Sequence, residues 1–154
     1  PLLFGGGQEG GRRSGTEPTA QIAGFAEAVR QRQSWNASHP GALEALRQYA
    51  MDRLGTIPGI QFLGGGAPHI LCLSLPGYPS QNIVNELDMN GICISAGSAC
   101  HRGAASHVFT AMGLPKKTAA GAVRASFGPE TTREDIDALA GALARHQSTR
   151  FPML

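Results

Sequence analysis

The chain has 154 residues, of which 42% are hydrophobic and 16% are charged, and its formal net charge is +2. This length and composition predict one globular domain with a real core and exclude a disordered tail. So small a net charge gives no reason to expect nucleic acid or a membrane surface as a partner, and no apolar run approaches the roughly 20 residues that span a bilayer.

The first part of the chain divides into a loop and a helix. Residues 5–18 are dense in glycine, which predicts a loop. A helix is predicted over 18–34, with Pro18 as its first residue. Along this helix, apolar side chains at offsets of 0, 3, 4 and 7 form a single stripe, made by Ile22, Phe25, Ala26 and Val29.

The middle of the chain alternates between helical and extended patterns. A second helix is predicted over 40–54, where a glycine follows as a stop. Two strands are expected over 57–63 and 69–75, because each is an apolar run and three glycines separate them. A third helix is expected over 80–89, with Ser80 as its N-cap.

Four further elements are expected toward the C-terminus. They are a short strand over 92–95, a short helix over 105–113, a strand over 123–127 and a last helix that begins at a capping box of Thr131 and Glu134. Two long helices followed by alternating strands and helices predict the α/β class, more closely an α+β-like domain. We expect a small mixed sheet with helices mainly on one face.

The cysteines and the first residues indicate where the protein works. Three cysteines are an odd number without CxxC spacing, which argues against a disulfide framework and a zinc knuckle. A reducing cytoplasm is therefore the expected location. The start of the sequence lacks the pattern of a signal peptide and has no initiator methionine, so we expect this sequence to be the middle of a longer chain.

Two of the three cysteines, Cys72 and Cys93, lie among large apolar residues and are expected to be buried fillers. Cys100 differs, because the small and polar residues around it form a loop that would not bury its sulfur. His101 and Arg102 follow it and favour the reactive thiolate. His107 lies farther on, but its spacing is poor for a metal, so no metal site is expected.

Three segments resemble one known family. Ser-Ala-Gly-Ser-Ala-Cys at 95–100 closely resembles the active-cysteine loop of the NifS/IscS-like cysteine desulfurases, in the class V aminotransferase superfamily. Residues 5–18 resemble the segment that follows the family's cofactor lysine region. The stretches 123–128 and 132–137 resemble its C-terminal substrate-arginine segment. Together these motifs cover nearly the whole chain in the family's order.

The resemblance implies a fold, an activity and roles for particular residues. The chain would be the small domain of a fold-type I enzyme that uses pyridoxal 5'-phosphate. Cys100 would take sulfur from L-cysteine as a persulfide, leaving L-alanine, and Arg124 would hold the substrate carboxylate. An arginine in an apolar strand is also costly to bury without a partner. Gly15 and Thr16 would contact the cofactor phosphate of the other subunit in a homodimer.

The resemblance also implies partners and a division of the chain. The form of the cysteine loop is similar to the group that supplies iron–sulfur scaffolds, so such a scaffold or another sulfur acceptor is expected as partner. Residues 1–17 would pack on a large domain, 18–150 would form the small domain, and 151–154 would be a tail. The family's cofactor lysine motif is absent, because the only lysines are Lys116 and Lys117. We therefore expect the isolated chain to be inactive.

Two alternatives remain open from the sequence. One keeps the superfamily and changes the chemistry, as in a selenocysteine lyase or another class V aminotransferase-like enzyme. The other is a non-enzymatic module that carries sulfur or binds a scaffold.

Overall fold

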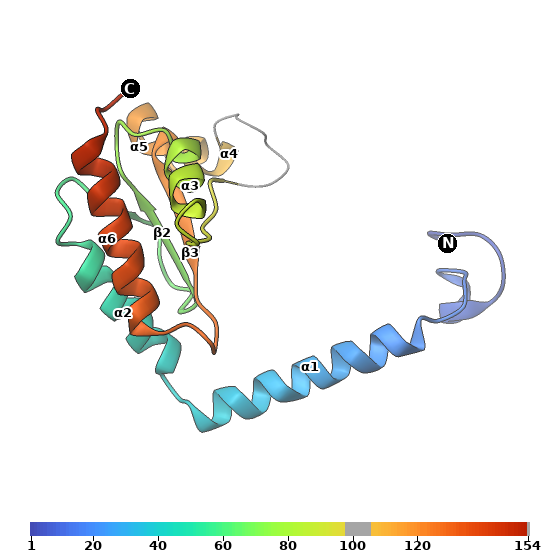
Figure 1. Ribbon diagram of the computed structural model, residues 1–154. Coiled ribbons are helices and arrows are strands. Elements are labelled where there is room, and N and C mark those ends of the chain that lie inside the picture. Colours follow the sequence, from blue (N-terminus) through green and yellow to red (C-terminus); the bar gives the residue numbers. More distant parts are fainter. Residues whose placement is uncertain (98–105, 154) are drawn as a thin grey trace. The chain divides into compact units, whose positions relative to one another are not determined.

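The computed structural model describes residues 1–97 and 106–153 (Figure 1). Cys100, the expected nucleophile, lies outside the described residues. The contacts within the chain divide it into two compact units, Pro1–Pro40 and Gly41–Leu154, and each is considered by itself below. The expected division of the chain into 1–17, 18–150 and 151–154 stays a prediction.

The first unit consists of a folded loop and one long helix. The loop contains a short 3-10 helix, η1, at Gln8–Gly11. Its ends are joined by hydrogen bonds from the Leu2 amide to the Arg12 carbonyl (2.7 Å) and from the Ser14 hydroxyl to the Gly6 carbonyl (2.8 Å). The glycine-dense segment is therefore a closed loop.

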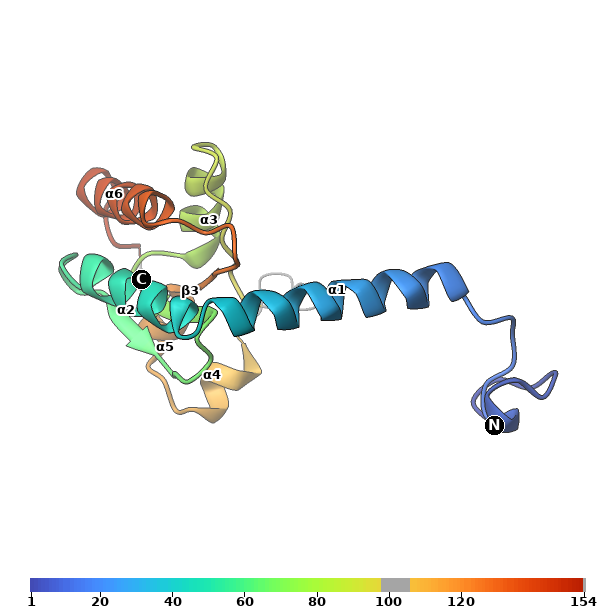
Figure 2. The ribbon, with the colours of Figure 1, turned by 90° about the horizontal axis from the view of Figure 1, so that it is seen from below.

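Helix α1 spans Thr19–Ser38 and continues without a break (Figure 2). It confirms the helix predicted over 18–34, except that Pro18 is the N-cap and not the first helical residue. The expected apolar stripe is present, but α1 buries none of its residues, and the Phe25 side chain is 73% exposed. The periodicity predicted the helix correctly, but no described residue buries its apolar side.

The second unit is a three-stranded antiparallel sheet with five helices among the described residues. The strands follow the order β1-β2-β3, and both pairings are antiparallel. Among the described residues the sheet is therefore purely antiparallel, and the expectation of a mixed sheet was wrong in this respect. The elements are α2 (Ala42–Leu54), β1 (Gln61–Leu63), β2 (Ile70–Ser74), α3 (Ser80–Asp88), α4 (His107–Ala111), α5 (Lys116–Ala120), β3 (Ala122–Ser126) and α6 (Arg133–Thr149). The α+β-like fold class is confirmed.

The core lies between one face of this sheet and the three longer helices. Leu73 in the central strand pairs with Phe62 on one side and with Val123 on the other, and the period of two places these side chains on the same face. Helix α6 contacts both α2 and α3, and its Leu143 is completely buried. Figure 2 shows α3 and α6 on one side of β3 and the short helices α4 and α5 on the other. The helices are thus mainly on one face, as expected.

Several local predictions differ from the structure. The expected strand over 57–63 is reduced to β1, and only Ser95 of the expected strand over 92–95 pairs, through one isolated bridge. The capping box lies one residue later than predicted, because Thr132 and Asp135 form it. Thr131 instead accepts a hydrogen bond from the Gly128 amide (2.9 Å). Among the described residues, no helix is long and apolar enough to cross a membrane.

Candidate functional site

Arg124 lies in the middle of β3 with its side chain on the face opposite the core. Its neighbours Val123 and Ala125 are buried, whereas Arg124 and Ser126 are exposed. This alternation follows from the two-residue period of a strand. The Arg124 side chain forms no hydrogen bond or ion pair with the described residues, so its guanidinium is available to a carboxylate.

Ser95 is hydrogen-bonded to Arg124 along the outer edge of β3. The Ser95 amide donates to the Arg124 carbonyl (3.1 Å), and the Arg124 amide donates to the Ser95 carbonyl (2.8 Å). Ser95 is also the first residue of the 95–100 motif, which ends at Cys100. The expected substrate arginine and the start of the expected cysteine loop are therefore adjacent, although they are 29 positions apart in the sequence.

The sheet face that carries Arg124 is partly covered by other described residues. Helix α5 covers the far end, where the Ser74 hydroxyl donates to the Thr118 carbonyl (2.7 Å) and the Thr118 hydroxyl donates to Gln61 (3.1 Å). Nearer Arg124, its Cα partner on β2 is Cys72, which is half-buried. This face thus carries a guanidinium and a half-buried thiol on cross-strand partner residues.

Cys93 differs from its expected role as a buried filler, because its side chain is exposed. The reason is that the segment 92–95 does not enter the sheet as a strand but lies along its edge. Two apolar neighbours in sequence do not bury a thiol when the backbone lies at the surface.

Gly15 and Thr16 lie in the first unit, just before α1. Gly15 has a φ of +120°, a conformation that side chains rarely adopt, and its amide donates to Gln8 (3.4 Å). A Cβ at Gly15 would lie 2.9 Å from a guanidinium nitrogen of Arg13, while Thr16 is exposed. A guanidinium and a hydroxyl on a glycine loop fit a phosphate. The structure does not relate these residues to Arg124, since they belong to the other unit.

The lysines do not fit a covalent cofactor anchor. Lys116 and Lys117 are the first two residues of α5, and both side chains are exposed to water. A lysine that forms a Schiff base needs a desolvated or otherwise activated amine. This chain therefore offers residues suited to a phosphate and to a carboxylate, but no residue suited to hold the pyridoxal ring covalently. Among the described residues, no group of His, Cys, Asp and Glu could hold a metal ion either.

A second polar cluster, which the sequence did not suggest, lies at the C-terminal end of α6. His146 is 2% exposed, and its Nδ1 lies 3.1 Å from a carboxylate oxygen of Glu86 on α3. Burial raises the pKa of Glu86, but hydrogen bonds from Arg150 and His146 outweigh it and hold that pKa below its ordinary value. His146 lies seven positions after the buried Leu139, on the apolar stripe of α6. This spacing was the signal in the sequence that could have predicted the burial of His146.

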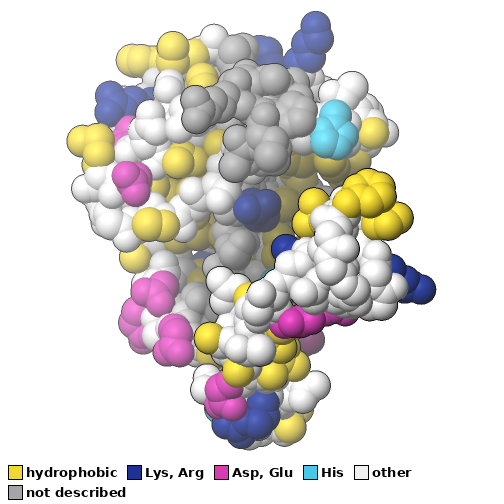
Figure 3. All heavy atoms as spheres, turned by 90° about the vertical axis from the view of Figure 1, so that its right-hand side faces the viewer, with side chains coloured by type: hydrophobic (Ala, Val, Ile, Leu, Met, Phe, Trp, Pro, Cys, Tyr) yellow, Lys and Arg dark blue, Asp and Glu magenta, His cyan; other side chains and the backbone are white. Residues whose placement is uncertain are grey.

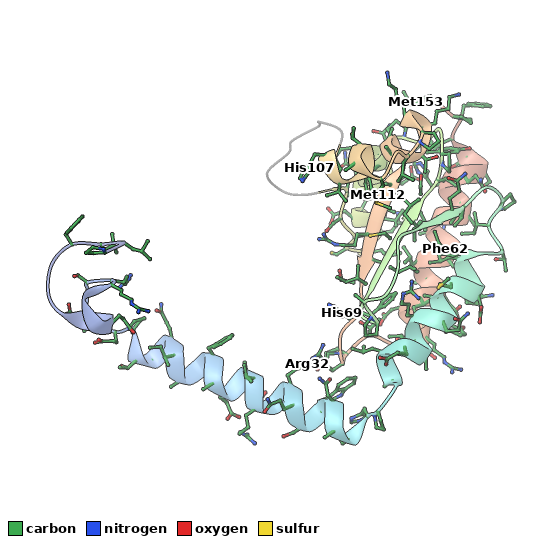
Figure 4. All side chains as sticks on the ribbon, turned by 180° about the vertical axis from the view of Figure 1, so that it is seen from behind. Arg32, Phe62, His69, His107, Met112 and Met153 are labelled. Atoms are coloured by element: carbon green, nitrogen blue, oxygen red, sulfur yellow. The ribbon has the colours of Figure 1, made fainter. Side chains whose placement is uncertain are left out.

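This cluster borders a groove of about 560 Å³ between α3 and the C-terminal tail. The Met153 amide donates to the Gly77 carbonyl (2.8 Å), and Figure 4 shows Met153 at this end of the unit. In the same view His107 on α4 and His69 before β2 lie at opposite ends of the sheet. Figure 3 shows Lys and Arg side chains of the described residues at several separate places.

Comparisons with known proteins agree on one family. The family model described as "Aminotransferase class-V" matches residues 6–139. A cysteine desulfurase IscS from Clostridium botulinum is 36% identical over 144 residues, which are 88% of this chain and 36% of that protein. A putative cysteine desulfurase IscS 1 from Bacillus subtilis is 35% identical, over 94% of this chain and 40% of that protein.

The solved structures support the same assignment. The structure of a NifS-like protein from Rickettsia africae superposes with a TM-score of 0.84 and 28% sequence identity, over 96% of this chain and 40% of that chain. The present chain thus spans about two fifths of the length of the relatives it matches.

Proposed function

Because this chain belongs to the aminotransferase class-V family, and within it to the NifS/IscS-like group, we propose that it is the C-terminal part of a cysteine desulfurase. The observation that carries the proposal is the backbone pairing of Ser95 with Arg124, since it joins the start of the cysteine loop to the residue suited to bind a carboxylate. The parent enzyme converts L-cysteine to L-alanine, and the sulfur passes to Cys100.

In the proposed reaction, Arg124 binds the carboxylate of the substrate cysteine. Two parallel N–H···O bonds from a guanidinium fix both the position and the orientation of such a group. The thiolate of Cys100 attacks the substrate sulfur, so that an S–S bond forms while the C–S bond of the substrate breaks. The carbon takes up a proton, and the products are alanine and a persulfide on Cys100.

Pyridoxal 5'-phosphate supplies the electron sink for cleavage of the C–S bond in this chemistry. Gly15 and Thr16 are the residues of this chain suited to contact its phosphate, in the neighbouring subunit of a homodimer. Neither lysine of this sequence is suited to anchor the cofactor covalently, so we propose that the isolated chain does not turn over cysteine. The persulfide then serves an iron–sulfur scaffold or another sulfur acceptor in the cytoplasm.

The proposal is tested by the mass of the intact chain. The chain is mixed with cysteine and a pyridoxal-phosphate-loaded desulfurase whose own nucleophilic cysteine has been replaced. We expect a gain of one sulfur atom on the chain, and no gain on the Cys100→Ala variant. Cys93→Ala is the matched control, because Cys93 is exposed. A gain that survives Cys100→Ala contradicts the assigned nucleophile, and no gain during confirmed cofactor turnover favours a passive module.

A further inference from the structure

His146 presents an unpaired ring nitrogen at the groove between α3 and the C-terminal tail. Its side chain is 3% exposed, and its Nδ1 lies 3.1 Å from Oε2 of Glu86. The other nitrogen, Nε2, forms no hydrogen bond with the described residues. Since no fully buried side-chain nitrogen or oxygen of those residues lacks a partner, the small exposed part of the ring includes Nε2. His146 lines the groove, so this nitrogen is available to a ligand there.

Glu86 decides the hydrogen-bonding character of that nitrogen. Burial raises the pKa of Glu86, but hydrogen bonds from Arg150 and His146 hold it below its ordinary value, so the side chain is a carboxylate that only accepts. Nδ1 of His146 therefore carries the hydrogen of the shared bond. In a neutral imidazole the second nitrogen then has a lone pair and accepts a hydrogen bond. The groove thus contains a largely buried acceptor whose tautomer is fixed by a neighbouring carboxylate.

The rest of the groove is mainly apolar, and its charged groups offset each other. Met89, Phe151 and Met153 contribute large side chains, and Met89 is 86% exposed. Arg150 donates to Oε2 of Glu86 (3.0 Å), so the two charges form a pair. The groove volume of about 560 Å³ is in the range of sites for small molecules. These features favour a small, uncharged ligand with an apolar body.

We propose that this groove is a binding site for small neutral aromatic molecules that carry one O–H or N–H donor, which bonds to Nε2 of His146. An aromatic ring suits the walls, because the sulfurs of Met89 and Met153 make favourable contacts with ring edges. An anion would meet the Glu86 carboxylate, and a cation would meet the Arg150 guanidinium. The inference goes beyond the proposed function, since none of the residues assigned to sulfur transfer lines this groove.

Binding of p-cresol to the full chain tests the site, with toluene as the comparison. The two compounds share the ring and the methyl group, and only p-cresol has a hydroxyl. Nitrogen NMR at about pH 8 follows the ring nitrogens of His146 and the backbone amides. Before addition we expect Nδ1 to be protonated and Nε2 to be unprotonated. We expect p-cresol to shift the Nε2 signal and to bind roughly fivefold tighter than toluene, the ratio that one ordinary hydrogen bond contributes.

Three variants locate the contact. His146→Phe keeps an aromatic ring at the position and removes the acceptor, so we expect p-cresol and toluene to bind equally. Met89→Ala shortens the apolar wall, and we expect both compounds to bind more weakly by a similar factor. Met112→Ala is the matched control, because Met112 is also an exposed methionine but does not line the groove. We expect this control to leave both affinities unchanged.

The proposal is wrong if Nε2 carries a proton, or if neither compound shifts the signals of the groove residues. It is also wrong if the two compounds bind equally to the wild type, or if the preference for p-cresol survives in a folded His146→Phe. The Nε2 signal of the wild type decides the question even where that variant does not fold, since a donor to this nitrogen moves the signal more than toluene does. None of these measurements involves sulfur transfer, so the outcome is independent of the proposed function.

Discussion

The Tyr49 hydroxyl of α2 lies 3.0 Å from both carboxylate oxygens of Asp137 on α6, and Arg53 donates to the same carboxylate from one turn farther along α2. Arg133 lies 4.9 Å from the centre of the Tyr49 ring, on the α6 side. Arg53 and Asp137 are 84 positions apart in the sequence, and their contact joins α2 to α6 through a polar group at the edge of the core.

This relationship predicts an acid-dependent stability. The hydrogen bond from Arg53 lowers the pKa of Asp137, burial opposes it, and the Tyr49 hydroxyl lowers it further. Since the folded pKa is below the unfolded value near 3.9, the stabilisation is complete above that value and is lost as the pH falls through the folded pKa. We expect Asp137→Asn to flatten the decline of unfolding free energy below about pH 4.

Urea unfolding between pH 2 and pH 7 measures this effect. Asp88→Asn on α3 is the matched control, because Asp88 is exposed and its carboxylate has no hydrogen bond among the described residues. Equal pH slopes for the wild type and Asp137→Asn contradict the prediction.

A close backbone approach predicts that Gly121 tolerates no side chain. A Cβ there would collide with the carbonyl group of Leu75, and the Leu75 amide donates a hydrogen bond to the Gly121 carbonyl (3.2 Å). Because the obstacle is backbone, relief requires the end of β2 to move away from the α5–β3 junction. We expect Gly121→Ala to lower the unfolding free energy by about 1–3 kcal/mol.

Gly128→Ala provides the comparison, since no atom lies within 4 Å of a Cβ at that position. Thermal unfolding of both variants checks the prediction. Equal melting temperatures would falsify it.

The observed cap of α6 predicts which threonine matters for that helix. Thr132 accepts a hydrogen bond from the Asp135 amide (3.2 Å) and donates to the Asp135 carboxylate (2.9 Å). We expect Thr132→Ala to cost about 1 kcal/mol of stability, because it leaves a helix amide without its partner. Glu134 is the residue that the sequence predicted would complete the capping box. We expect Glu134→Gln to lower the unfolding free energy by at most about 1 kcal/mol. A larger loss for Glu134→Gln in chemical denaturation contradicts the observed cap.

The exposed guanidinium predicts that Arg124 serves binding more than folding. Its side chain lies opposite the core, so Arg124→Lys is expected to leave the melting temperature nearly unchanged. A lysine lacks the planar fork, and we expect the sulfur gain on Cys100 to require a higher cysteine concentration in the mixed assay. Ser126→Ala, on the same face of β3, is the control. The assigned role is wrong if Arg124→Lys has a much lower melting temperature than the wild type, or if it gains sulfur at the same cysteine concentration.

The sequence alone determined the elements that depend on local patterns. The 3.6-residue spacing of Ile136, Leu139 and Leu143 predicted the last helix, and the small-residue motif ending at Cys100 indicated the family. Helix α5 was missed, because two lysines after a proline carry no apolar stripe. The capping box was displaced by one residue, because two adjacent threonines offer the same local signal and only the backbone path selects one of them.

Only the tertiary structure decided what lies beside what. No local pattern relates Ser95 to Arg124, because their pairing depends on how the chain returns to the edge of β3 after α3. Burial is likewise a property of the whole packing, which is why Cys93 is exposed while His146 is enclosed. The type and spacing of side chains can be read directly from the sequence. Contacts between distant segments depend on which packed arrangement of the whole chain has the lowest free energy.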